Sequence, residues 1–185
     1  MRGVHHIEIS SRYLKYEFDL RRNITVIRGN SATGKTTLVE MIRTYSEIGK
    51  DSGINLSCDV QCRVLEGNLW EEQLLFCRNS IVFVDEGNDF IKSQKFAECI
   101  KNSSNYYVLV TRENLDMLPV SVDEIYGIKS SGKYGGLEPV YHEFYRLFDF
   151  ENNQTEKYPV KPDKFIIEDS NSGFQFLRRD FCTAH

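Results

Sequence analysis

The sequence predicts an α/β fold in which a mainly parallel sheet is flanked by helices in three layers. Three short apolar runs carry this prediction, because strands buried on both faces of a parallel sheet consist almost entirely of apolar residues. The runs are Ile24–Ile27, Ile81–Val84 and Asn105–Val110, and helical patterns lie between them. With 185 residues and 41% hydrophobic content, the chain is long enough for one well-filled core.

The composition of the chain argues against nucleic acid and membranes as partners. Charged residues make up 27% of the chain and the formal net charge is −4, so no basic excess indicates nucleic acid. No apolar run approaches the ~20 residues that a membrane span needs. The first six residues do not supply the basic start and apolar run of a secretory signal. We therefore expect a cytoplasmic protein that does not contact a membrane.

Cysteine usage points to reduced thiols, because the cysteines are odd in number and no secretory signal precedes them. The five residues are Cys58, Cys62, Cys77, Cys99 and Cys182. Cys58 and Cys62 could form half of a zinc site, with His142 as a further ligand, but no second cysteine pair follows. We favour the alternative that both cysteines pack on a partly buried strand.

The N-terminal segments Val4–Ser10 and Leu14–Leu20 alternate or cluster apolar residues, and a short polar turn separates them. We expect an antiparallel hairpin that leads into the apolar run Ile24–Ile27.

The stretch after Ile27 follows the pattern G-x-x-x-x-G-K-[ST], which is the Walker A motif of P-loop NTPases. Gly29 and Gly34 allow the backbone N–H groups to turn inward toward phosphate. Lys35 is expected to reach the β- and γ-phosphates, and the Thr36 hydroxyl to bind Mg²⁺. The expected phosphate-binding residues are Gly29, Asn30, Ser31, Ala32, Thr33, Gly34, Lys35, Thr36 and Thr37.

The next elements are structural. A helix is expected from Thr36 to Ile48, because Leu38, Val39, Met41 and Ile42 have helical spacing. After a polar loop, residues 54–65 alternate apolar and polar side chains as a strand does, and residues 69–77 have helical spacing.

Two acids follow the apolar run Ile81–Val84, as in the Walker B motif. Open α/β sheets bind ligands at the carboxyl ends of their strands, which is where these acids are expected. Asp85 would hold Mg²⁺ through a coordinated water, and Glu86 would orient the attacking water. The alternative is a strand that ends in a solvated acidic turn.

A short helix over residues 93–101 precedes the strand Asn105–Val110, which ends in Thr111 and Arg112. In the catalytic-glutamate division of P-loop NTPases, the strand after Walker B often ends in a polar residue that senses the γ-phosphate. Thr111 matches that position, and Arg112 is a second candidate. Thr111 could equally be the N-cap of a following helix.

The C-terminal third contains further strand patterns, over residues 120–128 and 140–150, separated by a glycine-rich loop at 130–136. Residues 151–164 have the composition of a linker. Residues 165–173 form an apolar run that ends in acids, which is either a strand that packs on the core or the first strand of a further acidic metal-binding domain. We expect an ATPase domain over residues 1–150, and a linker with a C-terminal extension over residues 151–185.

Together the motifs from Ile24 to Arg112 resemble those of the catalytic-glutamate P-loop NTPases, the division that contains ABC-type and AAA+ ATPases. The resemblance implies a minimal, divergent three-layer P-loop NTPase fold with an N-terminal antiparallel hairpin and antiparallel edge strands at its C-terminal end. It also implies that Tyr13 or Tyr16 could stack on the nucleotide base, although packing of the hairpin is the use we favour. No LSGGQ-like signature lies between Lys35 and Asp85, so a transporter ATPase is not indicated.

The resemblance implies Mg²⁺-dependent ATP binding and hydrolysis that drives or times a conformational change in a larger assembly. Glu86, Lys35 and Thr111 are the expected catalytic residues, and Thr36 and Asp85 the metal ligands. We expect a homo-oligomer or a protein partner to supply an arginine, although Arg28, Arg112 and Arg146 are candidates within the chain. The alternatives are a nucleotide or small-molecule kinase, a nucleotide-binding switch that does not hydrolyse, and, more distantly, a nuclease using Glu168 and Asp169.

Overall fold

A computed structural model describes residues 3–29, 33–131 and 140–148 of the chain. The chain divides into two compact units, Met1–Asp149 and Phe150–His185, and every described residue belongs to the first. The predictions for residues 151–185 lie outside the described residues, as does most of the loop expected at 130–136.

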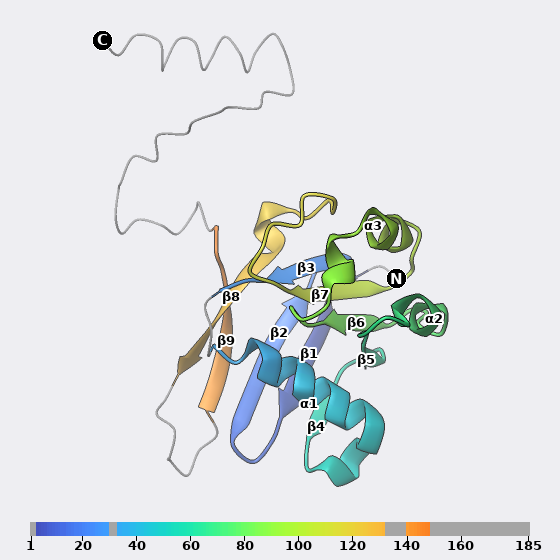
Figure 1. Cartoon of the computed structure of the whole chain (residues 1–185). Coiled ribbons are helices and arrows are strands. Elements are labelled where there is room, and N and C mark those ends of the chain that lie inside the picture. Colours follow the sequence, from blue (N-terminus) through green and yellow to red (C-terminus); the bar gives the residue numbers. More distant parts are fainter. Residues whose placement is uncertain (1–2, 30–32, 132–139, 149–185) are drawn as a thin grey trace, which may run out of the picture. The chain divides into compact units, whose positions relative to one another are not determined.

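In the described part of the chain, nine strands form one mixed sheet that curls across its width (Figure 1). Their order is β4-β1-β2-β9-β8-β3-β7-β6-β5. The strands are β1 (His5–Ser10), β2 (Leu14–Leu20), β3 (Ile24–Ile27), β4 (Asn55–Ser57), β5 (Cys62–Val64), β6 (Ile81–Val84), β7 (Tyr106–Val110), β8 (Ile125–Ser131) and β9 (Val140–Arg146). The α/β class is therefore confirmed, with a wider and more mixed sheet than the sequence predicted.

The sheet has a parallel part and a mixed part. Strands β8, β3, β7, β6 and β5 run parallel to one another in that order. The expected N-terminal hairpin is confirmed, because β1 and β2 pair antiparallel. The C-terminal strands β8 and β9 also pair antiparallel, but the prediction that they form an edge is wrong. β9 lies between β8 and β2, parallel to β2, so it joins the hairpin to the parallel strands.

The prediction of one strand over residues 54–65 is also wrong. The segment forms two three-residue strands on opposite edges of the sheet: β4 pairs with β1, and β5 pairs with β6. Its alternation of apolar and polar residues continues through the intervening turn, so the pattern did not reveal the break. Asp59 in that turn accepts hydrogen bonds from His5 Nδ1 at 2.8 and 2.9 Å, which ties the turn to β1.

Few helices accompany the sheet. They are α1 (Lys35–Ile48), α2 (Trp70–Leu75) and α3 (Gln94–Lys101), and short 3₁₀ turns occupy Gly49–Ser52, Asp89–Lys92 and Val122–Glu124. The helices predicted at 36–48, 69–77 and 93–101 are thus present, with the second shorter than expected.

Apolar side chains of β6 alternate between two hydrophobic clusters. Ile81 and Phe83 belong to the cluster that contains the buried residues of α1. Val82 and Val84 belong to the second cluster, which contains the buried residues of α2 and α3. Because successive side chains of a strand point to opposite faces, α1 packs on one face of β6 while α2 and α3 pack on the other.

Candidate functional site: the loop between β3 and α1

The loop after β3 contains two glycines whose backbone conformations favour glycine. Gly29 has φ +145° and Gly34 has φ +89°. Side chains also restrict Gly34: a Cβ atom there would lie 2.7 Å from the Tyr16 hydroxyl oxygen and 2.9 Å from the His142 ring. Conformation and space therefore both favour glycine at position 34, where α1 begins.

Tyr16 of β2 and His142 of β9 form the surface on which Gly34 rests. Their rings stack with centroids 4.4 Å apart, and both side chains are buried. The Tyr16 hydroxyl donates a hydrogen bond to the Gly34 carbonyl at 2.9 Å. Burial lowers the pKa of His142, which favours the neutral imidazole at this position. Tyr16 thus serves packing, whereas Tyr13 is 65% exposed.

Lys35 is the first residue of α1, and only 5% of it is exposed. Its ammonium group donates hydrogen bonds to the Gly29 carbonyl at 3.0 Å and to Thr33 Oγ1 at 3.1 Å. Burial lowers the pKa of Lys35, the nearby Glu86 carboxylate acts in the opposite direction, and Arg112 lowers it further. The ammonium group therefore lies inside the loop, close to the charged groups that follow β6 and β7.

Glu86 follows Asp85 at the carboxyl end of β6. The Glu86 backbone N–H donates to Asp85 Oδ1 at 2.9 Å, which fixes the Asp85 carboxylate within the turn. The Glu86 carboxylate accepts two hydrogen bonds from Arg112, from Nε at 3.0 Å and from Nη2 at 2.9 Å. This is a bidentate ion pair between the ends of β6 and β7.

A pocket of about 130 Å³ joins the two regions. It is lined by Thr33, Gly34, Lys35, Thr36, Thr37, Glu86 and Arg112. Five of the predicted phosphate-binding residues therefore surround one space together with the predicted catalytic Glu86. Of the other loop residues expected here, Gly29 accepts a hydrogen bond from Lys35 but does not line the pocket, and Asn30, Ser31 and Ala32 lie outside the described residues.

Thr111 is buried and is not among the residues that line this pocket. Its backbone N–H donates to the Ile27 carbonyl at 3.1 Å, so it lies beside the end of β3. Its hydroxyl accepts from the Glu113 N–H at 3.0 Å. No helix begins here in the described chain, so the helix N-cap alternative is wrong; the hydroxyl instead stabilises a turn that presents Arg112.

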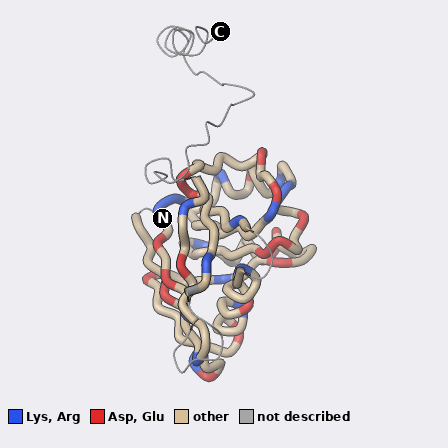
Figure 2. Tube along the Cα trace, turned by 90° about the vertical axis from the view of Figure 1, so that its left-hand side faces the viewer, with Lys and Arg blue, Asp and Glu red and all other residues tan. Residues whose placement is uncertain are grey.

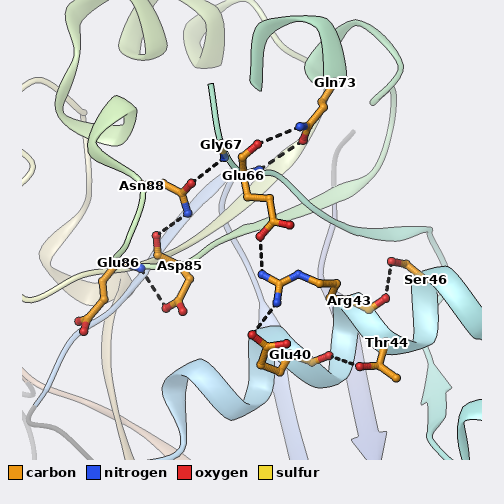
Figure 3. A network of polar contacts seen from close by, with 10 residues as sticks. All are labelled: Glu40, Arg43, Thr44, Ser46, Glu66, Gly67, Gln73, Asp85, Glu86 and Asn88. Carbon is orange, nitrogen blue, oxygen red and sulfur yellow. Dashed lines mark hydrogen bonds and ion pairs between the residues drawn. The ribbon is translucent and has the colours of Figure 1, made fainter. Parts of the chain in front are cut away.

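A polar network links the turn after β6 to α1 and α2 (Figure 3). Asn88 donates to the Asp85 carbonyl at 3.0 Å and accepts from the Gly67 N–H at 2.9 Å. The adjacent Glu66 pairs with Arg43 of α1, and its backbone exchanges hydrogen bonds with the side-chain amide of Gln73. Sequence reasoning missed this network, because its contacts join segments far apart in the chain and no local motif marks Asn88.

The other arginines considered from the sequence lie outside the pocket lining. Arg28 Nη2 donates to the Glu113 carbonyl at 2.9 Å, near the end of β3. Arg146 lies at the end of β9 and lines a different pocket, with Phe18 and Tyr126. Of these candidates, the pocket contains Arg112.

The suggested zinc site finds no support in the described part of the chain, where no cluster of three His, Cys, Asp or Glu side chains could hold a metal ion. His142 packs on Tyr16, and Cys58 and Cys62 flank the turn between β4 and β5. Among the described residues, no helix has the length and apolarity to span a membrane. Figure 2 shows acidic and basic residues interspersed along the chain.

Comparison with models of known protein families gives no match, and a search of curated proteins finds no relative of this chain.

The pocket lining is polar and carries charges of both signs. Lys35 and Arg112 are cationic, Glu86 is anionic and paired with Arg112, and Thr33, Thr36 and Thr37 carry hydroxyl groups. The pocket also adjoins the N-terminal end of α1, whose first turn contains no acidic residue. A helix N-terminus carries partial positive charge and exposes N–H groups, so it attracts phosphate.

Proposed function

We propose that this chain binds ATP with Mg²⁺ and hydrolyses it, and that the hydrolysis drives or times a conformational change in a larger assembly. The observation that carries the proposal is the shared pocket of Lys35 and Glu86. One residue begins the helix after β3 and the other follows β6, 51 positions later in the sequence (86 − 35 = 51). Their convergence joins a phosphate-binding group to a group suited to activating water.

The strand order supports assignment to the three-layer P-loop fold. β7 lies between β3, which precedes the glycine-rich loop, and β6, which precedes the two acids. The catalytic-glutamate division, which the motifs resemble, carries an extra strand, and β7 is the strand that follows the two acids in this chain. The packing of α1 on one face of β6 and of α2 and α3 on the other supports three layers in the parallel part of the sheet. The hairpin and β9 then extend that core.

The proposed mechanism assigns one task to each group. Lys35 binds the β- and γ-phosphates. The Thr36 hydroxyl would hold Mg²⁺, and Asp85, which is not among the lining residues, would hold it through a coordinated water; the ion would offset phosphate charge. Glu86 orients a water molecule for attack on the γ-phosphorus and accepts its proton, while the bond from that phosphorus to the β–γ bridging oxygen breaks and ADP leaves. Thr111 contributes by holding the turn that presents Arg112, since its hydroxyl is engaged with Glu113. Charge stabilisation and positioning supply most of the rate in such reactions.

A homo-oligomer or a protein partner that donates an arginine remains part of the proposal. An arginine supplied in trans can raise turnover by about 10³–10⁵. Specific activity is therefore expected to rise with protein concentration or on addition of the partner. Constant specific activity over a wide concentration range would count against this arginine and leave the ATPase proposal standing.

The test is steady-state phosphate release with ATP and Mg²⁺, measured for the wild type and for Glu86→Gln, with nucleotide binding measured in both. Gln keeps the size and hydrogen-bonding capacity of Glu but cannot accept a proton at neutral pH. We expect Glu86→Gln to retain binding and to lose at least about 100-fold in turnover, the lower end of the usual contribution of general base catalysis. Wild-type protein that binds ATP but releases no phosphate would instead indicate a switch or a kinase without its acceptor.

A further inference from the structure

The Glu86–Arg112 pair occupies the carboxylate that the proposed reaction requires. Both oxygens of Glu86 accept hydrogen bonds from the guanidinium group, at 3.0 and 2.9 Å. Because both carboxylate oxygens are engaged with the guanidinium group, the side chain of Glu86 is turned toward Arg112. In this arrangement Glu86 is therefore poorly placed to activate water.

The pair is also free to rearrange. The side chains of Glu86 and Arg112 are 33% and 55% exposed, and an ion pair at such exposure contributes little to stability. The backbone on each side is held by other contacts: Glu86 N–H by Asp85, and Thr111 N–H by the Ile27 carbonyl. A change of side-chain conformation can thus separate the charges without moving either strand.

A phosphate group in the pocket would give the Arg112 guanidinium group an alternative partner to Glu86. The guanidinium group and Lys35 line the same pocket, at the start of α1. Two cationic side chains therefore face one small pocket, where their charges repel each other. A phosphate oxygen entering between them would relieve this repulsion, and the planar guanidinium matches phosphate as well as carboxylate. The adjacent acid Glu113 accepts a hydrogen bond from Lys92 at 2.9 Å.

We propose that Arg112 is a latch that holds Glu86 until the terminal phosphate of a nucleoside triphosphate takes over its guanidinium group. The inference rests on the proposed function and adds the regulation of the same site. Binding of the triphosphate releases the Glu86 carboxylate, so the positioning of the water follows substrate binding. A nucleoside diphosphate lacks the terminal phosphate, so it leaves the Glu86–Arg112 ion pair intact. Arg112 then contributes nothing to the affinity for the diphosphate.

The test is a double-mutant cycle on nucleotide affinity. Dissociation constants for Mg²⁺·ATP and Mg²⁺·ADP are measured for the wild type, Arg112→Ala, Glu86→Gln and the double variant. Arg112→Lys, which keeps the charge without the planar fork, is included in case Arg112→Ala fails to fold. Lys92→Ala is the matched control, since Lys92 is an exposed cation whose ion pairs with Asp89 and Glu113 lie outside the pocket lining.

The latch predicts that Arg112→Ala lowers the preference for ATP over ADP about tenfold, since one hydrogen bond to a charged group accounts for roughly that factor. Arg112→Lys should lower the preference by a smaller factor, and Lys92→Ala should change it less than about twofold. Glu86→Gln removes the carboxylate that competes with phosphate for Arg112. It should therefore increase the affinity for ATP relative to that for ADP about tenfold when Arg112 is present. The same change in the Arg112→Ala background should have less than about a twofold effect.

Two results would overturn the latch while leaving the proposed function intact. One is an ATP-over-ADP preference that Arg112→Ala and Arg112→Lys leave unchanged. The other is an equal effect of Glu86→Gln in the two backgrounds, which would mean that the carboxylate repels ATP directly and independently of Arg112. Wild-type protein that binds neither nucleotide would overturn the proposed function, and the latch with it.

Discussion

Gly34 lines the candidate pocket, and both its backbone conformation and its close packing favour glycine. Its φ of +89° lies in the left-handed region, and the Tyr16 hydroxyl and the His142 ring occupy the space that a side chain would need. The Tyr16 hydroxyl also binds the Gly34 carbonyl. The motif predicted a glycine for the path of the loop, whereas the packing beneath it comes from strands far away in the sequence.

Gly34→Ala is expected to destabilise the fold by about 2 kcal/mol or more, because it adds a steric clash to the cost of a left-handed conformation. Gly67→Ala is the matched control: Gly67 has φ +73°, with nothing within 4 Å of its added Cβ. The free energy of unfolding of this control should fall by only about 1 kcal/mol, from the cost of the left-handed conformation alone. Urea unfolding of both variants measures the difference, and equal losses would mean that Tyr16 and His142 do not confine Gly34.

Glu124 is a buried carboxylate beside Thr25, which lies in β3. Burial raises its pKa above the ordinary value of 4.5, while Arg22 and Arg146 oppose the shift, and Thr25 Oγ1 donates to it at 3.5 Å. An acid whose pKa is raised on folding costs no stability below the unfolded pKa. It lowers stability as pH rises from there through the folded pKa.

Glu124→Gln is therefore expected to stabilise the protein at pH 8, by on the order of 1 kcal/mol, and the gain should shrink toward zero below pH 4.5, the ordinary value. Asp123→Asn, at the exposed neighbouring position, should change stability little at either pH. The free energy of unfolding at both pH values measures this. A gain at pH 4 as large as that at pH 8 would show that the charge of Glu124 is not the cause.

Among the helices and strands, the short apolar runs were readable from the sequence, whereas the partners of each strand were not. The buried strands β3, β6 and β7 were predicted because their sequences are almost entirely apolar, as is typical of strands buried on both faces. The separation of β4 from β5 was not predicted, because the alternation of side chains continues through the turn. The position of β9 was missed because pairing with both β2 and β8 depends on contacts distant in sequence.

The start of α3 depends on Ser93, which has an extended backbone and accepts a hydrogen bond from the Phe96 N–H at 3.2 Å. Ser93→Ala should cost about 1 kcal/mol in the free energy of unfolding, the usual value of an N-cap. Gln94→Ala, one position later, should cost less than about 0.5 kcal/mol. Thermal unfolding of the two variants compares these losses, and a Ser93→Ala protein as stable as the wild type would show that the cap is dispensable.

Across the whole molecule, the sequence predicted the class of the fold and much of the candidate site. It did so because the local motifs mark polar and charged residues that directly follow apolar strands. The mixed sheet extends that core with the N-terminal hairpin and β9, and β9 brings His142 against the start of α1. The Glu86–Arg112 pair was beyond sequence reasoning, although both residues had been named. Their contact depends on β6 and β7 being neighbours with their carboxyl ends at one side.

Every role proposed for this site requires the loop from Gly29 to Thr37 to bind the phosphates of ATP, and equilibrium titration with Mg²⁺·ATP measures that binding. Wild-type protein should bind, and Lys35→Ala should weaken binding about 10- to 100-fold, through the loss of charge-assisted hydrogen bonds to phosphate. Lys50→Ala, beyond the far end of α1, should bind as the wild type does. Affinities that do not differ between the wild type and Lys35→Ala, or a wild type that does not bind at all, would contradict the account.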